Sequence, residues 1–333
     1  MATLVLGLGT SHTPMLSTPW EQWAVGADRD KANPRLLGPD GVYYRYDELL
    51  ERADPRIAAE ELSEERWRAR HAAAQAAIAR LGEVLAEMSP HALVIVGDDQ
   101  GELFPEEQMP ALCIYWGESI GGFRPDPKLL HPGMVHPSLD VAAWGWYGDR
   151  QTIYPCDSAF GRHIIEALTA DGFDITSCRA PSEGRSIGHA YGFYERRIMR
   201  NGRIPIVPIF LNGYFPPNQP TAARSYALGQ AICRAIEAWD SDKRVAFAAS
   251  GGLSHLVINE ELDRQVIEAL KKKDERTLTD IPEKVLQSAN GEIKNWIAAA
   301  GALERLDMHL VDYVPAYRSP AGTGVGLTFA YWS

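Results

Sequence analysis

Apolar positions follow two patterns along the chain, and each pattern predicts a different kind of element. Between residues 64 and 88, apolar and alanine positions recur at helical spacing, and Ser63 followed by Glu64 supplies a normal helix start. Pro90 ends this helix, and residues 92–97 then form a short continuous apolar run, typical of a strand covered on both faces.

The same alternation continues to the end of the chain. We predict strands at residues 4–10, 92–97, 111–115, 173–178, 204–211 and 245–250, and strand-like tails at 309–314 and 325–332. We predict helices at residues 64–88, 158–170, 189–199, 221–239 and 260–273, and a further helix that opens near Glu292. Alternation of this kind indicates an α/β fold, in which helices cover both faces of a sheet.

Two segments break the alternation. Residues 20–54 are polar and interrupted by proline and glycine, which indicates an insertion that lies over another part of the molecule. Residues 117–154 accumulate glycine, proline and tryptophan without periodicity, which favours long loops over one face. A chain of 333 residues suits one large α/β core, so we interpret residues 1–333 as a single domain.

Composition and charge narrow the partners. The net charge of −11 is spread along the chain without a stripe of lysine and arginine, which argues against nucleic acid as a partner. No apolar run is long enough to cross a bilayer, and the start of the chain lacks the pattern of a secretory leader, so we expect no membrane association and a cytoplasmic protein. The four cysteines are scattered along the chain, so we expect them to be reduced thiols. We expect a homodimer, because dimers are the commonest closed assemblies.

Two histidines follow predicted strands. His12 stands in Ser-His-Thr-Pro after the first strand, and His255 follows Gly251 and Gly252 after the strand that ends at Ser250. Open α/β sheets place ligands and catalysts just beyond the carboxyl ends of strands. A lone histidine at a turn is more often structural, but two in the same setting favour a functional site.

Other polar residues fit the same site less specifically. Asp98 and Asp99 follow the strand at 92–97, where they are suited either to bind a metal or to cap a helix. His189 lies beside a glycine at a predicted helix start, and Glu292 lies in the first turn of another helix, where a carboxylate also stabilises the helix dipole. The chain has no dinucleotide fingerprint, P-loop, H-E-x-x-H or G-x-S-x-G motif, so the remaining pattern favours a mononuclear metal site.

In their order along the chain, these motifs resemble the class III extradiol ring-cleavage dioxygenases, a family that includes the catalytic β subunit of protocatechuate 4,5-dioxygenase and the gallate dioxygenases. The resemblance covers nearly the whole chain. It is carried by Ser11-His12-Thr13-Pro14, Asp98-Asp99-Gln100, Gly188-His189, Gly251-Gly252-Leu253-Ser254-His255, and Asn290-Gly291-Glu292 with Trp296.

The resemblance implies a three-layer α/β/α domain around a mixed sheet. It implies that His12 and Glu292 bind a non-haem Fe(II) ion, and that the substrates are O2 and a catecholic or gallate-like aromatic acid. It makes His255 the acid/base that takes a hydroxyl proton, and places His189 in the pocket as a hydrogen-bonding partner of the substrate. Residues 20–54 would then be an insertion over the active site of a single catalytic domain.

One position departs from the family pattern. Gln100 stands where the family has its second histidine ligand, and an amide oxygen is a weaker ligand than imidazole. Three accounts are open: Gln100 binds the metal through its oxygen, which we slightly favour; Asp98 or Asp99 takes over; or the metal site and its chemistry are altered.

The third account leads to alternative functions. One is a metal-dependent hydrolase or lyase of the same superfamily, which binds zinc or another divalent metal and does not activate oxygen. Another is a non-catalytic binding protein.

A carboxylate on the substrate would need a cationic partner, and the sequence does not choose among the candidates Arg124, Arg179 and Arg185.

Overall fold

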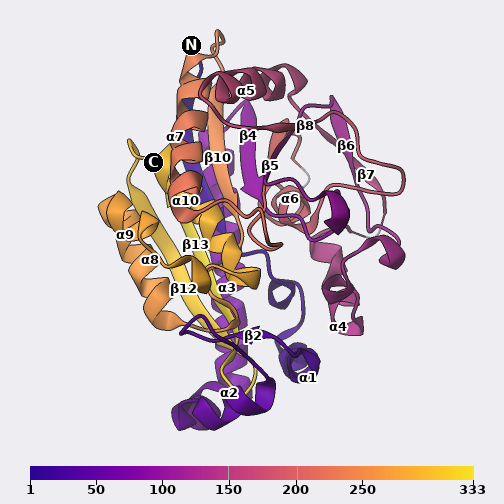
Figure 1. The fold of residues 1–333 in the computed structure, drawn as a ribbon, viewed down its shortest axis with the longest axis vertical. Helices are drawn as coiled ribbons and strands as arrows, with labels where there is room; N and C mark the ends of the chain where they lie inside the picture. The colour runs from indigo at the N-terminus through magenta and orange to yellow at the C-terminus, as the bar shows by residue number, and fades with distance from the viewer. Residues whose placement is uncertain (149, 201) are drawn as a thin grey trace.

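A mixed sheet of nine strands forms the centre of the molecule in the computed structural model, which describes residues 1–148, 150–200 and 202–333 (Figure 1). The strand order is β11-β13-β1-β10-β4-β9-β5-β8, and β12 pairs with β13 outside this path. The strands are β1 (Thr3–Thr10), β4 (Ala92–Gly97), β5 (Leu112–Tyr115), β8 (Thr176–Cys178), β9 (Ile206–Leu211), β10 (Arg244–Ser250), β11 (His255–Val257), β12 (Met308–Tyr317) and β13 (Thr323–Trp332).

The central strands β1, β10, β4 and β9 run parallel, whereas β13 and β5 are antiparallel to their neighbours β1 and β9. Every residue of β4 and β9 is buried, because helices cover both sides of the parallel strands. Side chains alternate between the faces, so Leu93 and Ile95 join one hydrophobic core and Val94 and Val96 join the other.

Helices form a layer on each face of this sheet (Figure 1). One layer contains α5 (Ser158–Ala170), α7 (Ala222–Ala238), α8 (Glu260–Lys272), α9 (Glu275–Thr279) and α10 (Ile293–Ala302). The other contains α3 (Glu64–Met88) and α6 (His189–Phe193), which continues as a π-helical turn over Tyr194–Ile198. This arrangement confirms the predicted three-layer α/β/α fold around a mixed sheet.

The predicted elements differ from the observed ones mainly at their ends. The helix predicted at 189–199 is divided between α6 and the π-helical turn, and β8 contains only the second half of the strand predicted at 173–178. The segment 117–154, of which residue 149 lies outside the described residues, contains the short helix α4 (Pro137–Asp140). It also contains a pair of strands that the prediction missed, β6 (Ser119–Gly122) and β7 (Thr152–Pro155).

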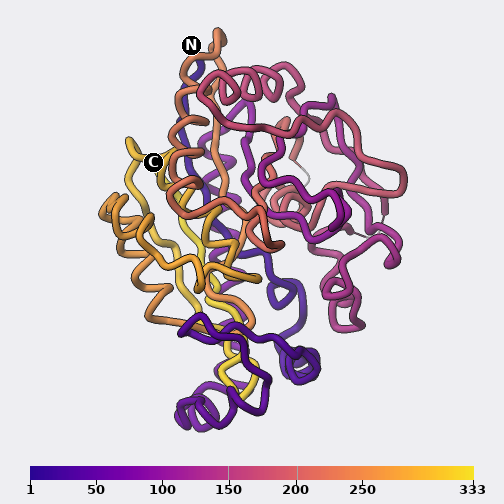
Figure 2. Tube along the Cα trace, viewed as in Figure 1, coloured from indigo at the N-terminus to yellow at the C-terminus, as the bar shows by residue number. Residues whose placement is uncertain are grey.

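The segment 20–54 has no single long element, as its irregular sequence predicted. It contains a 3-10 helix (Trp20–Val25), α1 (Gly26–Ala32), the paired strands β2 (Leu36–Leu37) and β3 (Tyr43–Tyr44), and α2 (Tyr46–Arg52). Figure 2 shows this segment in indigo at the lower end of the molecule, beside the yellow turn between β12 and β13. The buried Asp30 of α1 accepts two hydrogen bonds from Arg318 of that turn, at 2.6 and 2.7 Å, which ties the segment to the sheet.

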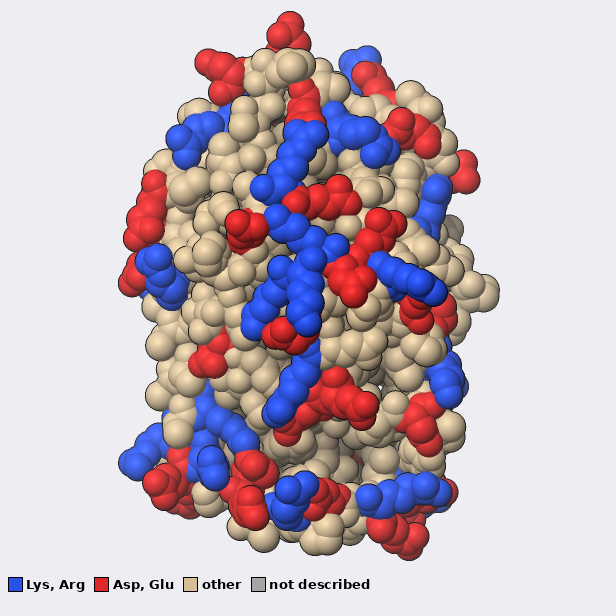
Figure 3. All heavy atoms as spheres, turned by 90° about the vertical axis from the view of Figure 1, so that its left-hand side faces the viewer, with Lys and Arg blue, Asp and Glu red and all other residues tan. Residues whose placement is uncertain are grey.

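Charged side chains of both signs are interspersed on the face shown in Figure 3. Helix α8 lies on that side and carries the ion pairs Arg264–Glu260 and Lys271–Glu268 along its surface. Within the described ranges, no helix combines the length and the apolar composition that spanning a membrane requires.

Candidate metal centre

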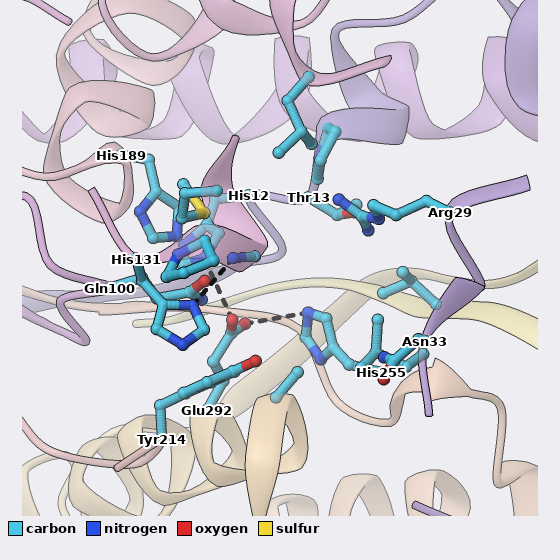
Figure 4. Close-up of a pocket in the computed structure, with 18 of the residues that line it drawn as sticks. His12, Thr13, Arg29, Asn33, Gln100, His131, His189, Tyr214, His255 and Glu292 are labelled. Atoms are coloured by element: carbon cyan, nitrogen blue, oxygen red, sulfur yellow. Dashed lines mark hydrogen bonds and ion pairs between the residues drawn. The ribbon is translucent and has the colours of Figure 1, made fainter. Parts of the chain in front are cut away.

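Polar side chains from several elements converge at one edge of the sheet (Figure 4). His12 follows β1 and Asp98 follows β4, while Glu292 ends the 3-10 turn that leads into α10. His189 opens α6, and His255 opens β11. Because β1, β10 and β4 are parallel neighbours, their carboxyl ends lie together, as the sequence predicted for His12 and His255.

Four of these residues are close enough to share one cation. Atoms of His12, Asp98, His189 and Glu292 that are able to bind a metal all lie within 4.8 Å of one another, and all four residues are buried. His12 Nε2 lies 3.4 Å from Glu292 Oε1 and 3.9 Å from Asp98 Oδ1. These separations are longer than a hydrogen bond or a close ion pair and leave space for an ion between the atoms.

Unsatisfied polar atoms support the same interpretation. Within residues 1–148, 150–200 and 202–333, His12 Nε2 and Asp98 Oδ1 are buried and have no hydrogen-bond partner. Buried polar atoms are nearly always paired, so two such atoms that face the same point need an explanation. Imidazole nitrogen and carboxylate oxygen are ligands for divalent first-row metals such as Fe(II), Mn(II) and Zn(II), so the donor set fits a metal ion.

The hydrogen bonds of His12 leave its Nε2 atom available to bind a metal. Ser250 Oγ donates its hydrogen to the carbonyl oxygen of Ala190 at 2.6 Å, so it must accept at its 2.9 Å contact with His12 Nδ1. The hydrogen of the neutral imidazole is therefore on Nδ1, and Nε2 carries the lone pair that a metal requires.

His189 is oriented by a buried carboxylate that the sequence analysis missed. Glu102 accepts hydrogen bonds from His189 Nδ1 at 2.7 Å, from the His189 backbone N–H at 2.6 Å, and from the hydroxyl of Tyr147. Burial alone would lower the pKa of His189, but the charge of Glu102 and its hydrogen bond raise that pKa to about 10. No motif marks Glu102, because only the fold brings it to His189.

Gln100 lines the cavity and is half-buried, and its amide nitrogen donates to Asp98 Oδ2 at 3.1 Å. Asp98 therefore has one oxygen held by Gln100 and the other facing His12. Burial, followed by the charge of Glu292, raises the pKa of Asp98. Asp99 has a different role, since its carboxylate accepts backbone N–H groups of the following loop, including that of Leu103 at 2.8 Å.

His255 lies next to Glu292. Its Nδ1 donates to the carbonyl oxygen of Leu253 at 2.7 Å, which directs Nε2 toward Glu292 Oε2 at 3.0 Å. Burial lowers the pKa of His255, but the carboxylate of Glu292 outweighs this effect and the pKa is raised. A Cβ on Gly252 would lie 2.5 Å from the ring, so the imidazole approaches the backbone as closely as only glycine allows.

A cavity of about 460 Å³ opens beside these residues, which is within the usual range for a small-molecule site. The five site residues predicted from the sequence all line it: His12, Gln100, His189, His255 and Glu292. The segment 20–54 contributes part of the wall through Arg29, Ala32, Asn33 and Pro34. Other lining residues that the sequence did not single out are His131, Met134, Trp146, Tyr214 and Arg318.

The arginines suggested as partners for a substrate carboxylate do not line this cavity. Arg124 pairs with Asp140 at 2.6 Å, Arg179 stacks over Trp116, and Arg185 donates to the carbonyl oxygen of Gly101 at 2.6 Å. The arginines among the lining residues are Arg29 and Arg318.

The fold and this cluster define an α/β protein with a candidate metal centre and a ligand cavity at the edge of its sheet. Residues 55–327 match the profile of the family described as the catalytic LigB subunit of aromatic ring-opening dioxygenase, and this match covers most of the chain. The protein belongs to that family, which confirms the resemblance found in the sequence. The match begins after the segment 20–54.

Named relatives agree with the family. Gallate dioxygenase of Pseudomonas putida is 31% identical over 160 residues, which are 44% of this chain and 45% of that protein. A 2,3-dihydroxyphenylpropionate/2,3-dihydroxicinnamic acid 1,2-dioxygenase of Rhodococcus jostii is 31% identical over 175 residues, which are 51% of this chain and 45% of that protein. The chain spans about half the length of the curated relatives it matches.

Proposed function

We propose that this protein is a non-haem Fe(II)-dependent extradiol dioxygenase that opens the ring of a catecholic or gallate-like aromatic acid with O2. The observation that carries the proposal is the buried, unsatisfied cluster of imidazole and carboxylate atoms beside a cavity, in a chain of the ring-opening dioxygenase family. The relatives named above are dioxygenases of gallate and of dihydroxyphenylpropionate, both of which are aromatic acids.

His12, Glu292 and Asp98 are the proposed metal ligands. Support for Asp98 comes from its free Oδ1, which faces His12 Nε2 at 3.9 Å, and from Gln100, which holds the other oxygen. Gln100 as the ligand remains the competing prediction, since its side chain also lines the cavity. A bound Fe(II) ion would supply adjacent positions for the two catechol oxygens and for O2, and would carry electron density between them.

His255 and His189 are proposed to transfer protons and to donate hydrogen bonds in the cavity. His255 holds its Nδ1 hydrogen against the carbonyl oxygen of Leu253, so its Nε2 exchanges protons with the cavity and takes one from a substrate hydroxyl. Glu102 accepts the hydrogen of His189 Nδ1, so the imidazole is held in a fixed orientation at the cavity wall, where it hydrogen-bonds the substrate or oxygen atoms beside it. Trp146 donates to the carbonyl oxygen of His12 at 2.8 Å, and its indole covers this end of the cavity.

The segment 20–54 is proposed to cover the site in cis. Its support is that four of its residues line the cavity and that the buried Asp30–Arg318 pair fixes its position. The homodimeric assembly and the cytoplasmic location remain predictions from the sequence. A light-scattering mass in solution would test the first, and cell fractionation the second.

One observation favours a second candidate, a hydrolase or lyase of the same superfamily that does not activate oxygen. The cluster contains two carboxylates, Asp98 and Glu292, where the family pattern has one, and an added carboxylate ligand in place of imidazole also suits zinc or another divalent metal. In this reading His255 is the base that activates water or removes a substrate proton.

Oxygen uptake separates the two candidates. The purified protein is reconstituted anaerobically with Fe(II), Mn(II) or Zn(II) and then mixed with a panel of catechols and gallate-like acids in oxygenated buffer. The dioxygenase proposal expects iron-dependent consumption of one O2 per ring opened. Retention of zinc together with no oxygen uptake by the iron-loaded protein on any member of the panel would overturn it.

A further inference from the structure

Arg29 is a charged side chain on the cavity wall whose charge has no partner. It lies in α1, is half-buried, and lines the cavity. Across the residues that the structure describes, its guanidinium makes no ion pair or hydrogen bond with another side chain. Arg318, the other arginine at the cavity, is in contrast held by Asp30 through two hydrogen bonds of 2.6 and 2.7 Å.

The surroundings of Arg29 favour an anion. Burial, and then the positive charge of Arg318, lower the pKa of Arg29 to about 10, so the group remains charged at neutral pH but at an energetic cost. Asp30 opposes this shift, but its two oxygens are occupied by Arg318. A partly buried guanidinium without a counter-ion is stabilised by any carboxylate that reaches it, and its planar fork matches carboxylate geometry.

The position of Arg29 indicates which ligand brings that carboxylate. Figure 4 shows Arg29 and Asn33 on the side of the cavity away from His189 and Gln100, with the Arg29 side chain extended toward Thr13 and the interior. His12 and Glu292, the proposed ligands labelled in the figure, lie on the His189 side of Arg29, and the unmatched cation faces the cavity from the other side. A ligand with a diol at one end and an acid group at the other would match both sides.

Resting on the proposed function, we infer that Arg29 binds the carboxylate of the aromatic acid substrate and thereby makes the site selective for acids over neutral catechols. Asn33 lies on the same wall and offers its amide to the same carboxylate. The specificity of the site for an acid then comes from the segment 20–54, outside the residues that match the family profile.

The test compares two ligands that differ only in the acid group, 3,4-dihydroxybenzoate and catechol. In Arg29→Gln we expect the KM for 3,4-dihydroxybenzoate to rise roughly 10- to 100-fold, the effect of losing a hydrogen-bonded charge pair, with the KM for catechol changed by less than about twofold. Arg29→Lys should restore part of the loss, since it keeps the charge without the planar fork. Lys31→Gln is the matched control, because it removes a positive charge from an exposed position of the same helix.

A second measurement does not depend on turnover. Titration calorimetry of the metal-free protein with benzoate should show the same weakening in Arg29→Gln and no weakening in Lys31→Gln. Equal losses for acid and neutral ligands, or no loss for either, would overturn the role of Arg29. A third outcome separates the two proposals. If the wild-type protein opens no catechol ring, but Arg29→Gln still weakens benzoate binding, the result would contradict the dioxygenase proposal and leave the anion site supported.

Discussion

The cavity has one wall made of strand ends and another made by the segment 20–54, and the two walls hold their side chains differently. On the first, His12 and Glu292 are buried and fixed by hydrogen bonds to the sheet and its turns, and the buried Asp98 lies in the same cluster. On the second, Arg29 and Asn33 lie on a short helix and the turn after it, and both are half-buried.

This difference suits a division of roles in which the first wall supplies the proposed chemistry and the second selects the substrate. A metal site needs ligand atoms held within a few tenths of an ångström, which the rigid ends of parallel strands provide. A pocket that selects a substrate tolerates more freedom, and loops and insertions supply it on many scaffolds. We therefore expect changes on the first wall to affect metal binding and turnover together, and changes on the second wall to affect substrate binding alone.

The largest effect is expected for Glu292→Gln. The change removes the charge of a proposed ligand, the carboxylate that faces His12 at 3.4 Å and His255 at 3.0 Å. Loss of a residue that only supports a ligand costs roughly 10- to 100-fold in metal affinity, so loss of the ligand itself should cost at least about 100-fold, with turnover reduced to match. Calorimetry with Mn(II) or Fe(II) under anaerobic conditions measures the affinity. The exposed Glu261→Gln is the control, and an unchanged affinity in Glu292→Gln would exclude Glu292 as a ligand.

A comparison of Asp98→Asn with Gln100→Leu decides between the two candidates for the third ligand. If Asp98 binds the metal and Gln100 only holds it, Asp98→Asn should weaken metal binding by roughly 100-fold and Gln100→Leu, the loss of a supporting residue, by roughly tenfold. The opposite order would show that Gln100 is the ligand. Because both variants leave His12 and Glu292 intact, the electron paramagnetic resonance spectrum of bound Mn(II) reports the change in ligands even when turnover is lost.

The sequence predicted the first wall much better than the second. His12 and His255 were found because each follows a short apolar strand, and the α/β fold brings the ends of such strands together. Glu102 could not be found in this way, since its contact with His189 joins residues far apart in the chain through a loop and a helix start. A carboxylate in a loop carries no pattern that separates it from the other acidic residues of the chain.

Arg29 was missed for a related reason. The irregular sequence of residues 20–54 predicted an insertion, but it contains no periodicity from which the direction of a side chain could be inferred. The arginines that were suggested, Arg124, Arg179 and Arg185, are engaged with other groups away from the cavity. The buried pair between Asp30 and Arg318 helps to place α1, and it joins residues far apart in the chain that no sequence pattern connects.

That pair offers an intermediate test of the second wall. Asp30→Asn leaves Arg318 buried without its counter-charge, which should loosen the segment 20–54 from the sheet. We expect the KM for an aromatic acid to rise roughly tenfold, equivalent to about 1.4 kcal/mol, while metal affinity stays within about twofold. Asp28→Asn, in an exposed pair on the same helix, should change neither. Equal loss of metal and substrate binding would count against the segment as a cover of the active site.

The smallest effect on metal and substrate binding is expected at the turn that carries His255. Asp263 is fully buried and accepts three hydrogen bonds of 2.7 Å, from the backbone N–H and hydroxyl of Ser254 and from the hydroxyl of Tyr313. Burial raises the pKa of Asp263 to about 6, and these hydrogen bonds only partly oppose the shift. The folded state therefore binds the proton more tightly than the unfolded state does. The stability that this provides is complete below about pH 4 and is lost as the pH rises through about 6.

Asp263→Asn should remove this part of the pH dependence. Between about pH 4 and 6, the free energy of unfolding of the wild-type protein relative to the variant should fall by up to about 1.4 kcal/mol per pH unit. Urea unfolding at several pH values measures the difference, and the slope is informative even if the variant is less stable at every pH. An identical slope in both proteins would mean that Asp263 is ionised in the fold at this pH. In that case the carboxylate of Asp263 would be an anion at every pH at which the enzyme works. In this charged form it would hold Ser254 and, with it, the turn before His255.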